Sequence, residues 1–243
     1  LDVGEATFVR FCRTLGFRGF SDFKLEFSIE VAKTQGGKDN SLLDTEVTAD
    51  DEPAKIARKL QSVINTVMDE TIDLLDLNQL ELVVRFIRRA NRVFIFGVGT
   101  SGVTAEDAKN KFMRIGIPVD ASGNNHFMYM QAALLQRNDV AIGISHSGYS
   151  QETAHALKIA KDNGATTVAL THSMRSPLTE HADFVLVNGN KQGKLQGDSI
   201  GTKISQLFVL DLIYALIVQA EQEKATQTKE KTLNVILEQR IKY

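Results

Sequence analysis

The sequence has little of what marks several classes of protein. Cys12 is the only cysteine in 243 residues, so an internal disulfide framework is impossible and a reducing cytoplasm suits the chain. Lysine and arginine number 28 against 30 aspartates and glutamates, so no overall basic field points to nucleic acid, although a small DNA-binding module fits within that total. No apolar run approaches the roughly 20 residues that span a bilayer, and no signal peptide is visible. We therefore expect a cytoplasmic globular protein without a membrane segment.

Apart from these absences, the composition is ordinary, with 43% hydrophobic and 24% charged residues. Apolar residues at helical spacing run through residues 1–33, a polar segment typical of a solvated linker covers 34–52, and helical spacing returns over 53–90. Pro53 opens this last segment, and proline is tolerated in the first turn of a helix. The sequence begins with Leu1 and not with methionine, and we expect residues to precede it.

After residue 90 the pattern changes to short apolar runs that alternate with helical spacing. The predicted strands are 93–96, 119–121, 140–144, 167–170 and 184–187. A helix is predicted over 128–136, between the second and third strands. A long apolar helix over 200–220 and a helical tail over 224–243 follow the last strand. Continuous apolar runs between helices indicate a parallel sheet that is covered on both faces. We therefore predict an α/β fold, a doubly wound parallel sheet over residues 91–223, with an all-α fragment before it.

The most informative segment lies where the strand 140–144 gives way to a helix. It reads Ser145-His146-Ser147-Gly148-Tyr149-Ser150-Gln151-Glu152. Backbone N–H groups at a helix start have no partner inside the helix and carry partial positive charge. Hydroxyl groups added to that end complete a cradle for a phosphate group. An ordinary serine-rich turn that caps a helix is the alternative.

A second loop, Gly97-Val98-Gly99-Thr100-Ser101-Gly102, follows the first predicted strand. Ligands of doubly wound sheets bind at the carboxyl ends of the strands near the topological switch point, where we expect both loops. The two glycines could belong to a dinucleotide fingerprint, but the acidic residue expected about 20 positions later would be Asp120, which is not clearly at a strand end. We therefore expect no dinucleotide, no other cofactor and no metal.

The serine-rich segment resembles the phosphosugar-binding loop of the SIS (sugar isomerase) family, whose pattern is Ser-x-Ser-Gly-x-Ser/Thr-x-Glu. Every fixed position of that pattern is present here. The resemblance implies a phosphosugar ligand whose phosphate is reached by Ser101. A third loop, Thr171-His172-Ser173, commonly lines the same pocket, although Ser173 or Ser176 could instead cap a helix.

Two residues outside these loops are further candidates. His126 follows two asparagines in a polar loop after the second strand, where a ligand contact and a structural or exposed role are both open. Lys203 lies in a segment similar to the Arg-Ile-Ala-Gln-Leu…Asp signature of SIS-containing regulators, and lysine in place of arginine loses the bidentate fork. The candidate ligand-binding residues are Thr100, Ser101, His126, Ser145, His146, Ser147, Gly148, Ser150, Glu152 and Lys203.

The N-terminal segment carries a second resemblance. Residues 5–24 resemble the recognition helix and following turn of the RpiR-type helix-turn-helix, with Gly4 in place of the usual serine N-cap. Arg10 and Arg13 share a helix face, and with Thr7 they are expected to reach phosphates or base edges in the major groove. Residues 1–33 contain five basic and five acidic side chains, so charge alone would favour an amphipathic helix with solvated arginines.

Together the two resemblances imply the MurR/RpiR family of bacterial transcriptional regulators, in which a DNA-binding head is linked to a SIS domain that senses a phosphosugar. Members often govern amino-sugar or hexose catabolism. The segments around His126 and Lys203 are most similar to regulators of sialic acid catabolism that sense N-acetylmannosamine 6-phosphate. The alternative is an aldose–ketose isomerase of the same fold, which would have no use for the N-terminal motif.

The family implies a homodimer that binds double-stranded operator DNA, and no enzyme activity. The 200–220 helix carries too many apolar residues for one sheet face to cover easily, and the 53–76 helix adds an apolar stripe, so we expect these helices to form the dimer interface. Neither the operator nor the sign of regulation follows from the sequence.

Overall fold

The computed structural model describes residues 11, 12, 14, 15, 17, 23, 47–189 and 200–240. The chain divides into two compact units, one formed by residues 1–60 and 192–197 and the other by residues 61–191 and 198–243. In the first unit, the rings of Phe11 and Phe17 pack edge-on against Phe23, at centroid distances of 6.3 and 5.2 Å. Cys12 is buried there. The proposed DNA contacts Thr7, Arg10 and Arg13 lie outside the described residues.

The second unit is built around a five-stranded parallel sheet with the order β2-β1-β3-β4-β5. The strands are β1 (Val93–Gly97), β2 (Val119–Ser122), β3 (Val140–Ile144), β4 (Thr166–Thr171) and β5 (Phe184–Val187). The chain builds one edge of the sheet through β1 and β2 and then crosses back to β3 on the other side of β1. The predicted α/β fold with a doubly wound parallel sheet is confirmed.

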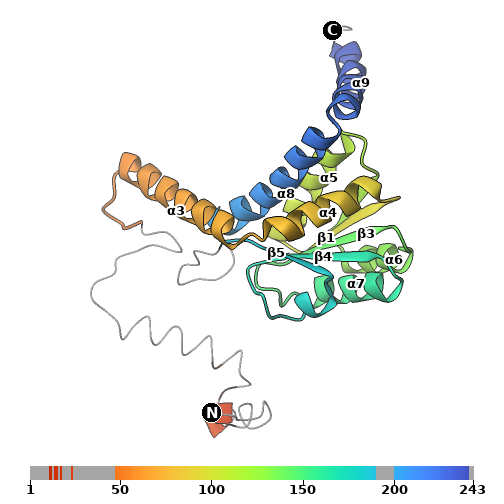
Figure 1. Cartoon of the computed structure of the whole chain (residues 1–243). Coiled ribbons are helices and arrows are strands. Elements are labelled where there is room, and N and C mark those ends of the chain that lie inside the picture. Colours follow the sequence, from red (N-terminus) through yellow and green to blue (C-terminus); the bar gives the residue numbers. More distant parts are fainter. Residues whose placement is uncertain are drawn as a thin grey trace. The chain divides into compact units, whose positions relative to one another are not determined.

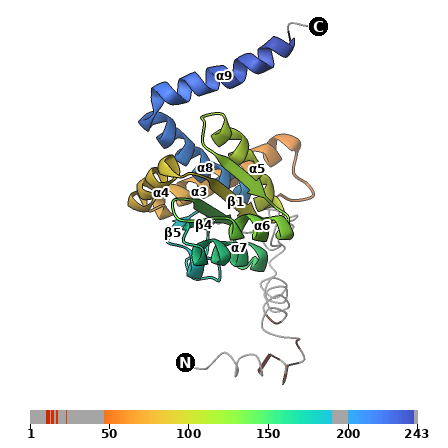
Figure 2. The same cartoon turned by 90° about the vertical axis from the view of Figure 1, so that its right-hand side faces the viewer.

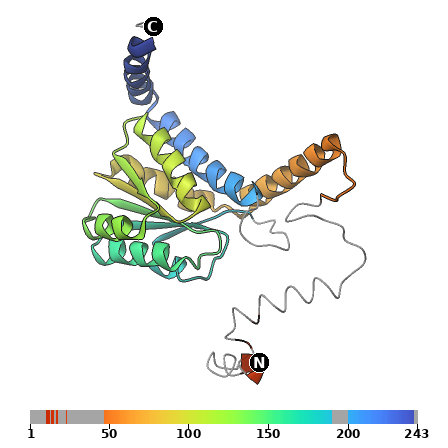
Figure 3. The ribbon, with the colours of Figure 1, turned by 180° about the vertical axis from the view of Figure 1, so that it is seen from behind.

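Helices cover both faces of this sheet (Figures 1 and 3). The helices α4 (Leu77–Arg89), α5 (Thr100–Met113) and α8 (Ile200–Ala220) pack on one face. The helices α6 (Asn125–Ala133) and α7 (Gln151–Asp162) pack on the other. The two layers explain why the strands read as continuous apolar runs: β3 is buried at all five of its positions.

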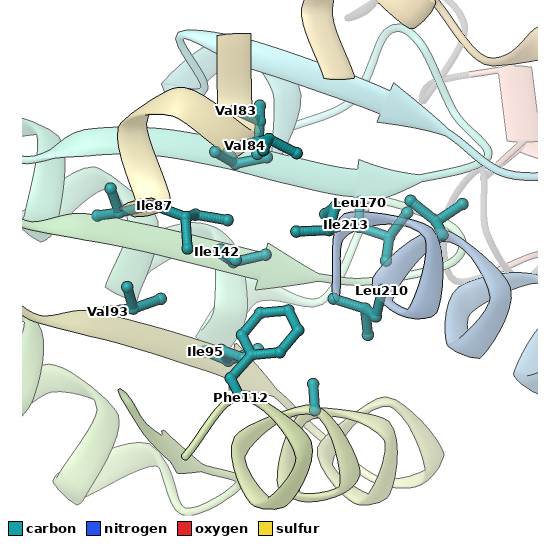
Figure 4. Close-up of a cluster of buried hydrophobic side chains, with 14 of the residues drawn as sticks. Val83, Val84, Ile87, Val93, Ile95, Phe112, Ile142, Leu170, Leu210 and Ile213 are labelled. Atoms are coloured by element: carbon teal, nitrogen blue, oxygen red, sulfur yellow. The ribbon is translucent and has the colours of Figure 1, made fainter. Parts of the chain in front are cut away.

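Side chains between the sheet and helices α4, α5 and α8 form the larger core (Figure 4). Ile95 and Ile142 are neighbours in the β1–β3 register and point toward Phe112 of α5 and Leu210 of α8. Ile87 of α4 packs into the same cluster and has no exposed surface. These contacts fix α5 and α8 against the carboxyl half of the sheet, where the candidate loops lie.

The structure corrects the predicted start of α6. Asn124 caps this helix, because its side-chain oxygen accepts hydrogen bonds from the N–H groups of His126 and Phe127 at 3.1 and 3.4 Å. The helix therefore begins at Asn125 and not near Met128. His126 lies in a first helical turn, and not in the polar loop that the sequence suggested.

The apolar helix α8 corrects two further expectations. It is long and apolar enough to cross a membrane, contrary to our estimate from apolar runs, but seven of its residues are buried within the second unit. The residues expected to remain uncovered are all buried or half-buried: Leu207, Phe208, Leu212, Ile213, Tyr214 and Ile217. Helix α8 therefore leaves less apolar surface free than the sequence suggested.

The remaining described elements are α3 (Pro53–Leu74), a 3-10 turn η1 (Thr179–His181) and α9 (Gln222–Arg240). Helix α9 follows α8 and extends away from the sheet (Figure 2). Four apolar side chains near its C-terminal end are exposed, namely Leu233, Val235, Ile236 and Leu237. Helix α6 exposes a stripe at helical spacing, namely Phe127, Met130 and Leu134.

Candidate functional site

The carboxyl ends of β1 and β3 are adjacent, and they lie at the point where the strand order reverses. Gly97 pairs in register with Ile144, so the loops that follow these two residues start side by side. Each loop leads directly into a helix, α5 after β1 and α7 after β3. Two helix N-termini therefore meet the sheet at its switch point, as the sequence predicted.

The β1–α5 turn is possible only because its residues are small. A Cβ atom on Gly97 would lie 2.7 Å from the carbonyl oxygen of Ser101, and one on Gly102 would lie 2.8 Å from that of Gly97. Gly99 has a φ of 61° and precedes the helix without a side-chain cap. The N–H of Gly102 donates to the Gly99 carbonyl at 3.1 Å, whereas the N–H groups of Thr100 and Ser101 at the start of α5 have no intrahelical partner.

Ser101 is held from the opposite side by Gln206 of α8. Both residues are buried. The Gln206 amide nitrogen donates to the Ser101 hydroxyl at 3.3 Å, and that hydroxyl donates to the Gln206 amide oxygen at 3.5 Å. The sequence motif included Gln206 but gave no role to it. A buried glutamine among the apolar residues of α8 was the available signal, since buried amides need partners. Thr100 beside Ser101 is exposed.

The β3–α7 loop arranges its serines by hydrogen bonds to its own backbone. The Ser145 hydroxyl accepts from the N–H of Ser150 at 3.5 Å, and the Ser147 hydroxyl accepts from the N–H of Tyr149 at 3.2 Å. Each bond occupies a lone pair and leaves the hydroxyl proton free to donate. Ser145 is buried, while Ser147 is exposed.

Ser150 and Glu152 form the helix end of this loop. Ser150 is the N-cap of α7, where its hydroxyl accepts from the N–H of Thr153 at 3.4 Å and donates to a carboxylate oxygen of Glu152 at 3.1 Å. The Ser150 proton is therefore already used. The N–H groups of Gln151 and Glu152, in the first turn of α7, remain without intrahelical partners.

Gly148 sets the shape of the loop. Its φ is 74°, and a Cβ atom there would lie 2.1 Å from the hydroxyl oxygen of Ser176. The 3-10 turn η1 has Leu178 as its N-cap residue, without a side-chain cap. Neither Ser173 nor Ser176 therefore caps a helix. Ser176 instead packs beneath Gly148, and the N–H of Leu178 donates to the Gly148 carbonyl at 3.1 Å.

His146 connects the loop to the ends of β4 and β5. Its ring stacks on that of His172 at a centroid distance of 5.6 Å, and its Nδ1 lies 3.4 Å from the side-chain nitrogen of Asn188. Asn188 is fully buried and donates to the hydroxyl of Ser205 in α8 at 2.7 Å. The sequence analysis missed Asn188, although a polar residue directly after a predicted strand at this edge was a usable signal.

The outer candidates lie at the same edge and are exposed. The end of β2 approaches the β1 loop, since a Cβ on Gly123 would lie 3.2 Å from the Gly97 carbonyl oxygen, and His126 follows three residues later. Lys203 lies one helical turn before Gln206, which contacts Ser101. No group of three or more potential metal ligands gathers among residues 47–189 and 200–240 or the few described before them.

Known proteins resemble both parts of the chain. A family profile for the SIS domain matches residues 86–216, and one for the rpiR-family helix-turn-helix domain matches residues 1–34. An uncharacterized HTH-type transcriptional regulator of Haemophilus influenzae is 73% identical over 242 residues, which cover 100% of this chain and 84% of that protein. The HTH-type transcriptional regulator RpiR of Escherichia coli K12 is 28% identical over 232 residues, covering 96% of this chain and 77% of that protein.

A solved structure shares the fold over almost the whole chain. The Vibrio vulnificus NanR protein complexed with ManNAc-6P superposes with a TM-score of 0.82 at 23% sequence identity. The match covers 97% of this chain and 82% of that one.

Proposed function

The chain belongs to the rpiR family of HTH-type transcriptional regulators that carry a SIS domain, and we propose that this regulator senses a phosphosugar at the switch point of its sheet. The observation that carries the proposal is the meeting of two helix N-termini, those of α5 and α7, with serine hydroxyls whose protons are free. Such a concentration of donors suits a phosphate group.

Individual roles follow from the hydrogen bonds. Ser145 and Ser147 donate their hydroxyl protons to phosphate oxygens, together with the free N–H groups of the first turn of α7. Ser101, held by Gln206, faces the same phosphate from α5. Ser150 acts on the ligand only indirectly, because its proton goes to Glu152. Gly148 keeps the loop in shape, and His146 supports it from the side of β4 and β5.

The sugar end of the ligand is read by acceptors and by exposed donors. A carboxylate beside a phosphate is repulsive, so Glu152 is suited to accept hydrogen bonds from sugar hydroxyls and not to bind the phosphate. His126 and Lys203, with Thr100, supply donors at the rim. We propose N-acetylmannosamine 6-phosphate as the candidate effector. The NanR complex supports this choice, because that protein shares the fold and is bound to ManNAc-6P.

DNA is bound by the N-terminal part of the chain. Residues 1–33 supply part of the helix-turn-helix, and Thr7, Arg10 and Arg13 face the DNA groove. Residues 34–52 form the linker to the helices of residues 53–90. The sensing domain then covers residues 91–223, and residues 224–243 form a tail. A homodimer would bind a palindromic operator in the cytoplasm. The effector must bind one arrangement of the dimer more tightly than another, since equal affinity would shift nothing. The operon would serve sugar or amino-sugar catabolism.

Two measurements test this function. Titration calorimetry with N-acetylmannosamine 6-phosphate, glucose 6-phosphate and unphosphorylated N-acetylmannosamine should show binding only for phosphorylated sugars. Binding of the unphosphorylated sugar with equal affinity would contradict the phosphate cradle. In a gel-shift assay on the intact protein, Arg10→Ala should weaken operator binding, and unchanged affinity would remove Arg10 from the interface.

The isomerase alternative makes a different prediction. Isomerisation needs a general base near the first two carbons of the sugar, and Glu152 or His126 are the residues available for it. A sensor releases its ligand unchanged. An NMR time course with aldose and ketose phosphates should therefore show no conversion above the blank. Conversion that is lost on mutation of Glu152 or His126 would favour the enzyme.

A further inference from the structure

The backbone at the end of β5 packs tightly against helix α3. The N–H of Gly189 donates to the hydroxyl of Thr71 at 2.9 Å, and that hydroxyl donates to the carbonyl of Val67 at 2.6 Å. A Cβ atom on Gly189 would lie 2.5 Å from the Val67 carbonyl oxygen, so the backbone just after β5 lies directly against the backbone of α3. Thr71 is fully buried. Any displacement of residue 189 must therefore move α3 or break these bonds.

The same strand end is tied to the β3–α7 loop through the residue before Gly189. The side-chain nitrogen of Asn188 approaches the Gly189 carbonyl at 3.2 Å, the Ser205 hydroxyl at 2.7 Å and His146 Nδ1 at 3.4 Å. The backbone carbonyl of His146 accepts from the hydroxyl of Thr171 at 3.1 Å, so the loop and β4 move together. Three hydrogen-bonded steps thus connect the candidate phosphate loop to α3.

One buried atom in this network has no partner. The side-chain oxygen of Asn188 makes no hydrogen bond within the described part of the chain, although the residue is fully buried. A loop arrangement that brings a donor to this oxygen is therefore favoured over one that does not.

We propose that Asn188 and Thr71 are positioning residues that transmit occupancy of the Ser145–Ser150 loop to helix α3. The inference rests on the proposed function, since it requires a phosphosugar in that loop. Helix α3 continues along the chain to Pro53, after which the proposed linker 34–52 leads to the DNA-binding residues. The path gives the sensing site a physical connection to the segment that carries the DNA-binding head.

Hydrogen–deuterium exchange on the full chain tests this path, with N-acetylmannosamine 6-phosphate as the probe and glucose 6-phosphate as a second. In the wild type, the ligand should change exchange both in the loop, residues 145–151, and in residues 61–74 of α3. Thr71→Val removes the acceptor for the Gly189 N–H. Because Thr71 bonds to Gly189 and Val67 and not to the Ser145–Ser150 loop, the variant should keep probe affinity within about twofold and lose the response of α3 alone. Thr71→Ser should retain the response.

Thr66→Val is the matched control. Thr66 lies on the same helix and bonds the Ser62 carbonyl in the same way at 3.0 Å, but it is exposed, and it is Thr71 that receives the Gly189 N–H. An α3 exchange response that is unchanged in Thr71→Val would overturn the inference. In the wild-type protein alone, a ligand response in the loop without any response in α3 would also overturn it. Failure of both probes to bind wild-type protein would contradict the proposed function itself, and the inference with it.

Discussion

Ser147 gives the cleanest test of phosphate recognition by a single side chain. Its hydroxyl is exposed and accepts only a backbone hydrogen bond, so Ser147→Ala should disturb the fold little while it removes one donor to a charged oxygen. Such a bond is worth roughly 1.5–3 kcal/mol, or about 10- to 150-fold in affinity. Titration calorimetry measures the loss, and Ser62→Ala on exposed α3 is the control. Equal affinities in the two variants would place the phosphate elsewhere.

Gly148 shows how backbone geometry limits the loop. Gly148→Ala would force a positive φ on alanine and drive its Cβ into Ser176, so we expect a loss of ligand binding together with a loss of stability. Gly164→Ala is the matched control, because Gly164 has a φ of 85° but its nearest neighbouring atom is 4.0 Å away. In urea unfolding, the control should lower the free energy of unfolding only by the strain of a positive φ on alanine, about 1–2 kcal/mol. A ligand affinity of Gly148→Ala equal to that of the control would show that the loop tolerates the clash.

Residues in one contiguous motif were predictable from the sequence, and residues that meet across the fold were not. The serines of the β3–α7 loop and Gly148 could be assigned from their spacing after an apolar strand. The partners Gln206 and Asn188 could not, because they approach Ser101 and His146 only through the packing of α8 and the order of the strands. Ser150 stays a predicted ligand residue, and spacing alone did not reveal that it caps α7 and donates to Glu152.

Helix α4 is joined to the α8–α9 junction by an ion pair. Arg88 donates to Glu221 at 2.8 Å and thereby lowers the pKa of Glu221 below its usual 4.5, with a smaller contribution from Lys224. Because the pKa of Glu221 is lower in the folded state, the ion pair stabilises the protein fully at pH values above the usual carboxyl pKa. This stabilisation is lost as the pH falls through the lowered pKa. Arg88→Gln should therefore destabilise the protein by up to about 1 kcal/mol at neutral pH and by less below pH 4.5.

Thermal unfolding across the acid range measures this effect, with the exposed neighbour Arg89→Gln as the control. A penalty for Arg88→Gln that stays constant into the acid range would show that the ion pair is not its source.

At the scale of elements, periodicity identified all five strands and the described helices that flank them. It placed the start of α6 too late, because the Asn124 cap, and not an apolar residue, decides where that helix begins. It also overestimated the free apolar surface of α8. A count of apolar residues cannot tell how many neighbours will cover them, and α8 packs against the sheet, α4 and α5 together.

For the whole molecule, we predict a homodimer. Helix α3 exposes Ile72 and Leu74, and the exposed stripe of α6 and the exposed apolar side chains of α9 are two further surfaces available for it in the described part of the chain. Light scattering at micromolar concentration should give twice the mass of the chain. Met130→Glu and Leu237→Glu test the two surfaces separately, and a monomeric wild type would contradict the prediction.

The central claim is that a phosphosugar bound by the SIS domain controls DNA binding by the N-terminal part of the protein. Linkage requires the effector to change operator affinity and the operator to change effector affinity by the same factor, typically about 5- to 150-fold. Fluorescence anisotropy of labelled operator DNA with the intact protein, titrated with N-acetylmannosamine 6-phosphate, measures this factor directly. The account predicts a shift in operator affinity that saturates at the effector affinity found by calorimetry and that Ser147→Ala moves to higher effector concentration. Operator affinity that is independent of a bound effector would contradict it.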